Sequence, residues 1–438
     1  MENKLIKYLK YVLVILSLLT SVTYLNSTVL RDGFKLCFLA SFLLVAYTFY
    51  KNKNRWNQFE YKILLLFCIS YAFTIIFNVR NHFINEVLIL GYLFMSFFLM
   101  TYLPDSKSQE RILNEIFSYC WIIIGVTFVF SSINVILFYL EELDIISLEN
   151  VKYLYSFEKS YQLGGLFNPN VAGMLSMISL LLSALFLYLN KHFKFFNMLN
   201  VIIQGICFSL IQSRGSWVCL LAFLFFFIMF VLHFNKTKFT GFKKYVYKFL
   251  IACGASLLLM GTSFISRQLV SFSINVIQLN DKTIDREKKE DDSLNSITTG
   301  RSGLWKVGFE AYKEEPILGI GYRSIDDALK KHLTKYDYKN SAQGGLHNVY
   351  ITTFVSSGAV GFFIFSLFLL YLIFTVFKIV FHYRFSIVEK FFVSLVPVLL
   401  VGELVESRIV FGMNFITVLF WILTGYVFYL KKRMNRHD

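Results

Sequence analysis

Long apolar runs recur along the whole chain, and they constrain its fold more than any other feature of the sequence. A run of roughly 18 or more apolar residues can cross about 30 Å of hydrocarbon as an α-helix. Inside a bilayer, backbone N–H and C=O groups must bond within their own segment, so the sequence predicts helical spans. Membrane strands would alternate polar and apolar residues, whereas a segment such as LLAFLFFFIMFVL does not alternate. Only 16% of the residues are charged, against about 25% in soluble domains, which agrees with a lipid environment.

The hydrophobic pattern predicts about twelve transmembrane helices. They cover approximately residues 8–25, 34–50, 61–79, 84–103, 113–140, 171–190, 195–212, 215–234, 245–266, 348–379, 386–404 and 410–430. The chain then divides into residues 1–266 with nine helices, a loop at 267–347 with short interfacial helices, and residues 348–438 with three helices. The predicted fold class is an all-α polytopic membrane protein with one long extracytoplasmic loop between spans nine and ten.

Basic residues predict the orientation of these spans. Under the twelve-helix count, 23 Lys and Arg residues fall on the side of both termini, and seven fall in the short loops opposite. Positive residues favour the cytoplasmic side in short loops, and long loops are exempt from this rule. Both termini are therefore predicted to be cytoplasmic. The net charge of +15 is then explained by the loops between spans rather than by a nucleic-acid partner.

The predicted orientation limits the chemistry that the chain can perform. The long loop and the segments IQSRGSWV and GELVESRIVFGMN face the outside of the membrane, where no ATP is available. The sequence contains no Walker, GxGxxG, HExxH or GxSxG pattern, and its Asp326–Asp327 pair is adjacent rather than DxD. A reaction on this face must therefore use a pre-activated substrate, and no cofactor or metal site is predicted.

Two arginines and one histidine stand out on the predicted outer face. Arg214 lies between two apolar runs, where a charge is costly and usually faces a cavity or a partner. Arg301 begins a predicted amphipathic helix on the membrane surface, and its guanidinium and the helix N-terminus together would attract an anion. His347 stands where a hydrophilic loop meets an apolar helix, and a neutral imidazole can act as a general base. The alternatives are an arginine that snorkels to water, a solvated arginine and a structural histidine.

These side chains suit an anionic, lipid-linked substrate, because arginine binds phosphate oxygens bidentately. Two asparagines in GGLFNPNVAG could bind sugar hydroxyls, or they could cap the helix that follows. Glu406 is a further candidate for substrate binding, or it pairs with Arg408 and does nothing else. The predicted site therefore has His347 as its catalytic residue and binds substrate through Arg214, Arg301, Asn168, Asn170 and Glu406.

The chain resembles the O-antigen ligase/polymerase superfamily of bacterial membrane glycosyltransferases over about residues 164–362. The resemblance is carried by four segments in the family's order, GGLFNPNVAG, SLIQSRGSW, GRSGLW…PILGIGYRS and GLHNVYITTFVSSGAVGFF. It implies transfer of a glycan from an undecaprenyl-pyrophosphate carrier to an acceptor sugar hydroxyl outside the cytoplasmic membrane, without a nucleotide sugar or a metal. It also implies that Arg214 and Arg301 bind the pyrophosphate and stabilise it as it leaves, while His347 positions or deprotonates the acceptor hydroxyl.

Within this resemblance, composition favours a polymerase. The chain is rich in Lys, Asn, Ile, Phe and Tyr and poor in Pro and Ala, which indicates an AT-rich genome. Such genomes are common among Gram-positive bacteria, which have no lipid A-core. We therefore expect polymerisation of lipid-linked repeat units into a capsule, exopolysaccharide or O-antigen. The alternatives are a ligase that transfers finished glycan to lipid A-core or another acceptor, and a flippase that transports lipid-linked oligosaccharide.

The same hypothesis predicts where the protein acts and with what. The expected location is the bacterial cytoplasmic membrane, which the chain crosses many times. The expected partners are membrane lipid, an undecaprenyl-pyrophosphate-linked donor and acceptor, a flippase and chain-length regulator proteins, with no nucleic acid. Against a transporter, the sequence has no similarity between its halves, and its polar candidates gather at one surface.

Overall fold

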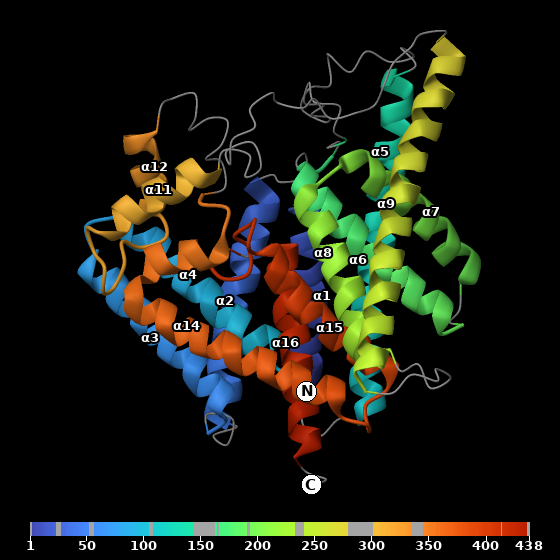
Figure 1. The fold of residues 1–438 in the computed structure, drawn as a ribbon. Coiled ribbons are helices and arrows are strands. Elements are labelled where there is room, and N and C mark those ends of the chain that lie inside the picture. Colours follow the sequence, from blue (N-terminus) through green and yellow to red (C-terminus); the bar gives the residue numbers. More distant parts are fainter. Residues whose placement is uncertain are drawn as a thin grey trace.

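The computed structural model of this chain is a bundle of helices (Figure 1). It describes residues 2–22, 28–51, 57–104, 108–142, 163, 166–190, 193–232, 241–278, 301–333, 345–412 and 414–435. Within these residues there is no β-strand, and a single isolated bridge joins Val22 to Phe167. The predicted all-α fold class is therefore confirmed.

Twelve helical segments lie where the apolar runs predict spans. They are α1 (Glu2–Leu19), α2 (Thr28–Lys51), α3 (Phe59–Phe77), α4 (Phe83–Phe94) continued by the π-helix η2 (Met95–Met100), α5 (Gln109–Glu142), α6 (Pro169–Tyr188), α7 (Lys194–Ile211), α8 (Arg214–Phe226) continued by the π-helix η4 (Phe227–Val231), α9 (Phe242–Gln278), α14 (Val349–Phe381), α15 (Ile387–Gly402) and α16 (Phe415–Met434). Two shorter helices, α11 (Arg301–Tyr312) and α12 (Ser324–His332), lie between α9 and α14.

Nine of these segments are long and apolar enough to cross a membrane, as counted within the described residues. Among the others, α1 carries four charged residues, and α15 has 16 residues that rise about 24 Å, less than the about 30 Å of a hydrocarbon core. The molecule is thus a multi-pass membrane protein, as predicted. Both labelled chain ends lie at the end of the bundle away from α11 and α12 (Figure 1), which fits an even number of spans.

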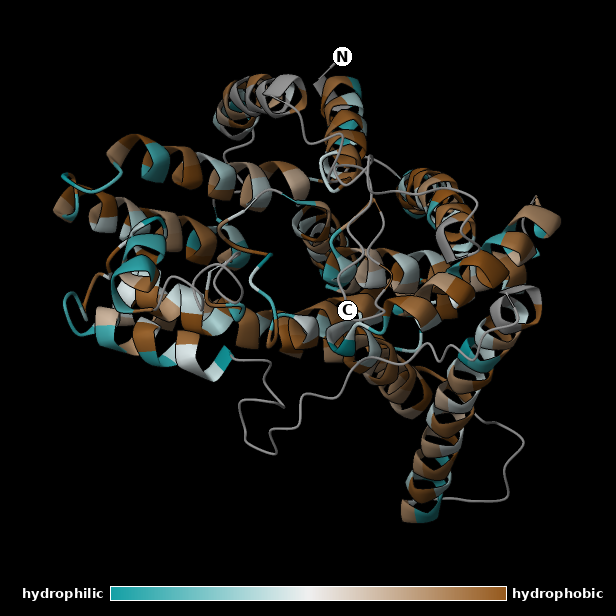
Figure 2. Ribbon diagram, turned by 90° about the horizontal axis from the view of Figure 1, so that it is seen from above, coloured by the Kyte–Doolittle hydropathy of each residue, from teal (hydrophilic) through white to brown (hydrophobic). Residues whose placement is uncertain are grey.

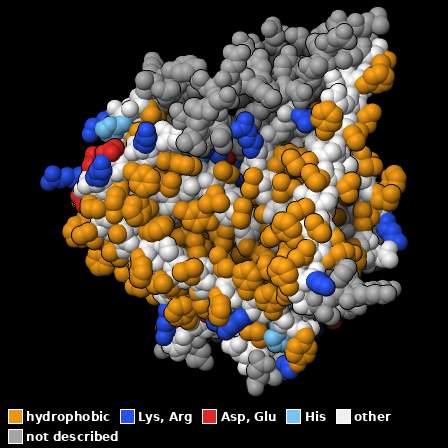
Figure 3. Space-filling model, viewed as in Figure 1, with side chains coloured by type: hydrophobic (Ala, Val, Ile, Leu, Met, Phe, Trp, Pro, Cys, Tyr) orange, Lys and Arg blue, Asp and Glu red, His pale blue; other side chains and the backbone are white. Residues whose placement is uncertain are grey.

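The outer surface of the bundle is apolar. Hydrophobic side chains cover the middle of the face drawn in Figure 3, while most of the visible Lys and Arg side chains lie above and below this band. Seen from above, most helices are hydrophobic along most of their length (Figure 2). On α9, for example, Leu257 and Leu258 are 70% and 73% exposed. Such a surface is stable in contact with lipid rather than with water.

The centre of the bundle is formed by α16, whose span is 89% buried. Trp421 of this helix contacts Phe97 of η2 and Phe368 of α14, with ring centroids 4.5 and 5.6 Å apart. Its indole N–H donates a hydrogen bond of 2.8 Å to the carbonyl of Ile409, which lies in the segment between α15 and α16. The core therefore fixes this segment directly, and the segment carries Glu406.

The predicted boundaries differ from the observed ones mainly at α9. The hydrophobic pattern ends a span near residue 266, whereas α9 continues to Gln278 and projects beyond the bundle (Figure 1). The helix that was expected to begin near Arg301 is observed as α11. Residues 279–300 and 334–344 of the predicted long loop lie outside the described residues.

Helix α14 is broken near its start by Gly358, whose φ of 65° and ψ of −173° are not helical. The carbonyls of Val355 and Ser356 accept hydrogen bonds from Ile320 and Gly321 at 3.2 and 3.0 Å. The N–H groups that follow the break, at Ala359 and Val360, donate to the carbonyls of residues 316 and 317 at 2.9 and 3.2 Å. The segment after α11 thus satisfies the backbone groups that the break frees, as a span near lipid requires.

The same segment is anchored on α3. The hydroxyl of Thr74 donates to the carbonyl of Leu318 at 2.5 Å, and the amide of Asn78 donates to the carbonyl of Gly319 at 3.0 Å. Because the segment holds both α3 and the broken part of α14, it fixes the position of α11 relative to the membrane helices.

We expect Gly358→Ala to destabilise the protein by about 2 kcal/mol or more, because a Cβ at this positive φ would overlap the carbonyl of Ile317. The measurement is the midpoint of thermal unfolding in detergent. Gly254→Ala in α9 is the matched control, since its Cβ would meet no atom within 4 Å and alanine favours a helix. Equal midpoints for the two variants would contradict this account of the break.

Candidate functional site

Glu406 joins four side chains from four parts of the fold. Its Oε1 lies 2.8 Å from the amide nitrogen of Asn170 and 3.2 Å from a guanidinium nitrogen of Arg301. Arg408 approaches the same oxygen at 3.4 Å, and Nδ1 of His347 lies 3.4 Å from Oε2. The side chains of the ion-paired residues are 11% to 17% exposed. We call Asn170, Arg301, His347, Glu406 and Arg408 the Glu406 cluster.

The cluster brings together four of the six predicted site residues. His347, Arg301, Asn170 and Glu406 come from segments far apart in the sequence and meet in space. The pair of Glu406 and Arg408 that the sequence suggested is present, but it is one contact of four.

Glu406 lies in the segment between α15 and α16, which is fixed by buried hydrogen bonds. The carboxylate of Glu403 accepts from the backbone N–H groups of Arg408 and Ile409, at 2.7 and 3.2 Å. The N–H of Val349, at the start of α14, donates to the carbonyls of Glu403 and Glu406 at 3.0 and 2.9 Å. These bonds fix the backbone of the segment around the Glu403 carboxylate. They also join the segment to Val349, two residues after His347.

His347 has a φ of 47°, a left-handed conformation that is uncommon for residues other than glycine. Its neighbours hold it there. The indole N–H of Trp305 donates to the carbonyl of Leu346 at 2.9 Å, and the amide of Asn348 donates to the carbonyl of Leu404 at 2.9 Å. The oxygen of the Asn348 side chain also caps α14, because it accepts hydrogen bonds of 3.0 Å from the backbone N–H groups of Tyr350 and Ile351. Such strained residues are concentrated at functional sites, where packing enforces them.

The two predicted asparagines have different roles in the structure. The side chain of Asn168 accepts from the N–H of Asn170 at 3.0 Å and caps α6, which is the structural alternative that the sequence left open. The side chain of Asn170 instead joins the Glu406 cluster, and its oxygen accepts from the hydroxyl of Ser213 at 3.3 Å. Asn168 therefore lies beside the cluster through its cap rather than within it.

Arg214 is the first residue of α8, directly after Ser213, and it is exposed. The next residue, Gly215, packs so closely that a Cβ there would lie 3.0 Å from Val405, the residue before Glu406. The backbone of Arg214 thus lies beside the cluster, although the hydrogen bonds and ion pairs that Glu406 makes among the described residues go to other side chains.

Two arginines surround the ionised carboxylate of Glu406, so the cluster has an excess of positive charge. Burial raises the pKa of Glu406, but Arg408, the hydrogen bond to His347 and the charge of Arg301 outweigh burial and lower it to about 2. Burial also raises the pKa of Glu403, to about 7, against the opposing effects of Arg408 and two backbone N–H groups. At neutral pH both arginines therefore face the fully charged carboxylate of Glu406, and Arg408 alone also acts on the partly protonated carboxyl group of Glu403.

This arrangement can bind an anion and move a proton. Arginines in a site that is largely shielded from water bind phosphate oxygens strongly, because the local dielectric constant is low. A carboxylate at Nδ1 of a histidine orients the ring and leaves Nε2 to accept a proton. Among the described residues, no group of three or more His, Cys, Asp and Glu side chains could hold a metal ion.

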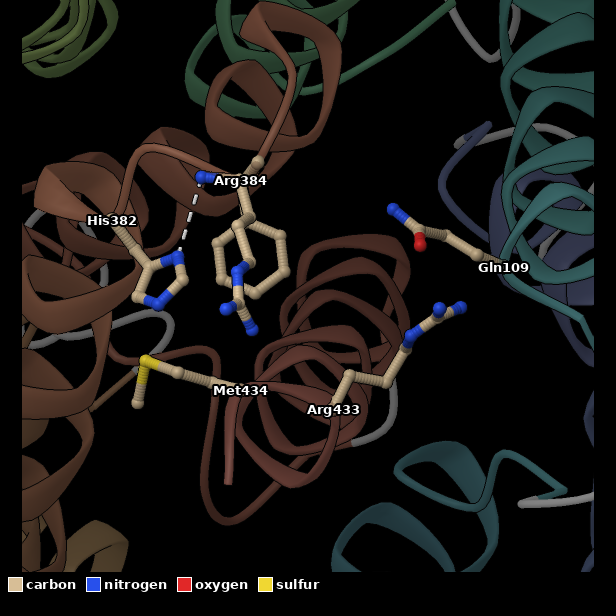
Figure 4. A pocket seen from close by; sticks show the side chains of 6 residues that line it. Gln109, His382, Arg384, Arg433 and Met434 are labelled. Carbon is tan, nitrogen blue, oxygen red and sulfur yellow. Dashed lines mark hydrogen bonds between the residues drawn. The ribbon is translucent and has the colours of Figure 1, made fainter. Parts of the chain in front are cut away.

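A separate cavity has a volume of about 320 Å³, and Figure 4 shows the side chains that line it. Its wall includes His382 and Arg384 after α14 and Arg433 at the end of α16. Because His347 precedes α14 and His382 follows it, the full length of this helix separates the cavity from the Glu406 cluster. None of the predicted site residues lines it.

Sequence reasoning missed what holds the site in place. Trp305 is not among the predicted site residues, yet its N–H fixes the turn of His347. Ser213 was not singled out, although it connects the start of α8 to Asn170. The polar SRGS stretch between two apolar runs was the available signal for Ser213, whereas nothing local predicts the Trp305 contact.

Residues 199–366 match the family model described as O-antigen ligase. The matched region contains Arg214, Arg301 and His347, and it ends before Glu406. No curated protein matches the chain. The resemblance noted from the sequence is therefore confirmed over the region that carries three of the site residues.

We expect the stability of the protein to fall as the pH rises from 4.5 to about 7, because of Glu403. Its pKa is raised from the ordinary 4.5 to about 7, so in this range the folded state keeps a proton that the unfolded state has lost. The loss is on the order of 3 kcal/mol for a shift of this size. It is measured as the midpoint of thermal unfolding in detergent across this pH range.

Glu403→Gln should remove this slope, because an amide oxygen can still accept from the backbone and does not titrate. Glu310→Gln is the control, since Glu310 is 62% exposed and pairs only with its neighbour Lys313 among the described residues. If Glu403→Gln keeps the wild-type slope, the raised pKa of Glu403 is wrong.

Proposed function

We propose that this protein polymerises lipid-linked oligosaccharide repeat units, a proposal supported by the match of residues 199–366 to the O-antigen ligase family model. The donor and the acceptor are glycans on undecaprenyl pyrophosphate, and the product is a capsule, exopolysaccharide or O-antigen. The reaction takes place at the outer face of the bacterial cytoplasmic membrane. It uses no metal or nucleotide cofactor.

The observation that carries the proposal is the Glu406 cluster. A base must lie beside an anion-binding group if a sugar hydroxyl is to displace a pyrophosphate. His347 and Arg301 both contact Glu406, at 3.4 and 3.2 Å, so they are neighbours on one carboxylate. The buried, positive surroundings of this carboxylate suit a leaving group that gains negative charge.

In the proposed reaction, an oxygen of the acceptor hydroxyl attacks the anomeric carbon of the donor glycan. A carbon–oxygen bond forms there, and the bond from the anomeric carbon to the pyrophosphate oxygen breaks. The hydroxyl proton passes to Nε2 of His347, and the electron pair leaves with undecaprenyl pyrophosphate. Glu406 stabilises the imidazolium that forms through Nδ1, while Arg301 and Arg214 stabilise the leaving pyrophosphate.

Composition and charge support the finer parts of the proposal. The composition typical of an AT-rich genome favours a polymerase over a ligase that acts on lipid A-core. The distribution of basic residues favours cytoplasmic termini, with the Glu406 cluster on the outside. A flippase that delivers repeat units and a protein that regulates chain length are the expected partners.

We expect His347→Ala to lower the rate of polymer formation by about 10²–10⁴, because the acceptor hydroxyl loses its base. The assay uses the full-length protein in liposomes with extracted lipid-linked repeat units, and the polymer is separated on gels. His332→Ala is the matched control, since His332 is exposed at the end of α12 and should leave the rate unchanged. A wild-type rate for His347→Ala would remove histidine from the mechanism, and lipid movement without any new glycosidic bond would favour a transporter.

We expect Arg301→Lys to lower the rate by about 10- to 100-fold, because the charge stays but the two-pronged hydrogen bonding is lost. The loss should appear in the turnover rate with saturating acceptor. Lys306→Ala on the same helix is the control, since this lysine is exposed. Full activity of Arg301→Lys would contradict pyrophosphate binding at this position.

A further inference from the structure

A second polar cavity, of about 390 Å³, lies beside the turn that carries His347. One wall is formed by His82 and Asn85 at the start of α4, and another by residues 322–330. The third wall is formed by Gly345 and Leu346, the two residues before His347, together with Thr352 in the first turns of α14. We call this cavity the α4–α12 pocket.

The charges that line the α4–α12 pocket are balanced. Asp326 and Asp327 lie in it with Arg323 and Lys330. His82 lies 2.6 Å from the carboxylate of Asp327, and Lys330 pairs with Asp326. A wall whose carboxylates are paired in this way offers no excess positive charge to a phosphate, whereas its mixture of donors and acceptors matches the hydroxyls of a sugar. The pocket therefore differs in chemistry from the Glu406 cluster, where cations are in excess.

The hydroxyl of Thr352 points to a missing partner. Thr352 is 1% exposed and lines the pocket, yet its Oγ1 has no hydrogen-bond partner within the described residues. Serines one turn later satisfy themselves on helix carbonyls, as Ser356 does with the carbonyl of Thr352 at 2.6 Å. A buried hydroxyl without a partner is costly, and this one has almost no accessible surface, so a ligand hydroxyl would satisfy it once the Thr352 side chain rotates toward the pocket.

Two residues of the pocket wall, Tyr322 and Arg323, are held in place by buried neighbours that lie behind the wall. The buried carboxylate of Glu86 accepts from the hydroxyl of Tyr71 at 2.5 Å and from the N–H of Arg323 at 2.7 Å. Tyr322 stacks on Phe411, with ring centroids 5.1 Å apart and planes at 17°. Phe411 belongs to the same segment as Glu406, so the pocket and the Glu406 cluster are built on shared elements.

From this we infer that the α4–α12 pocket binds the acceptor glycan and presents its hydroxyl to His347. The inference rests on the proposed function, and it divides the two substrates between two sites. The pyrophosphate of the donor lies at the positive Glu406 cluster, and neutral sugar rings of the acceptor lie in the charge-balanced pocket. The backbone that joins the sites is the strained turn from Gly345 to His347.

The test is Thr352→Val, which removes the hydroxyl and keeps the shape of the side chain. Full-length protein in liposomes receives a fixed amount of extracted lipid-linked repeat units as donor. The acceptor is a repeat-unit oligosaccharide freed of its lipid by mild acid, and the elongated soluble product is measured as its concentration rises. Loss of one neutral hydrogen bond should raise the acceptor KM about three- to tenfold, with kcat and the donor KM unchanged.

Thr353→Val is the matched control. Thr353 is also fully buried, its Oγ1 also has no partner within the described residues, and it does not line the pocket. Removal of an unpartnered hydroxyl should not lower the unfolding midpoint of either variant, so folding does not obscure the comparison. Asn85→Ala, on the opposite wall, should raise the acceptor KM as Thr352→Val does.

Three outcomes would overturn the inference, namely an unchanged acceptor KM in both pocket variants, an equal rise in Thr353→Val, or a rise in the donor KM instead. Failure of the proposed function has a different signature, because His347→Ala would then keep the wild-type rate. If His347→Ala is inactive while Thr352→Val and Asn85→Ala are indistinguishable from wild type, the function stands and the pocket is not the acceptor site.

Discussion

The structure depends on the largely buried carboxylate of Glu406, most of whose partners come from distant parts of the chain. Glu406 is 14% exposed and contacts side chains from the start of α6, the start of α11, the turn before α14 and its own segment. Removing one partner from a buried ion pair is costly, because it leaves an uncompensated charge. The carboxylate therefore holds together the parts of the chain that contribute to the site, and in the same geometry it orients an imidazole.

The break in α14 positions the Glu406 cluster relative to the membrane helices. Without Gly358, the first turns of α14 would continue straight, and residues 316–321 would lose the backbone groups on which they dock. The docked segment connects α11, with Arg301 and Trp305, to α3 and α14. A discontinuous helix is tolerated in a membrane protein where neighbouring backbone satisfies the freed groups, and here that requirement also positions the site.

The different charges of Glu403 and Glu406 follow from their neighbours rather than from their burial. Burial by itself would raise the pKa of both glutamates, but Arg408, His347 and Arg301 lower the pKa of Glu406 to about 2. Glu403 has backbone donors and one arginine, and its pKa rises to about 7. Two carboxyl groups three residues apart thus carry different charge at neutral pH, which keeps the surroundings of Arg301 and Arg408 positive.

The sequence by itself determined the helical, membrane-spanning architecture, because apolar runs long enough to cross a bilayer have few other stable structures. It also indicated His347, Arg301, Asn170 and Glu406, because polar side chains at the ends of apolar helices are costly unless they have a role. Only the tertiary structure decided that these four meet, that Asn168 is a cap, and that Trp305 and Glu403 fix the site. The reason is that hydropathy reports which segments enter lipid, whereas the contacts of Glu406 depend on how helices far apart in the sequence pack together.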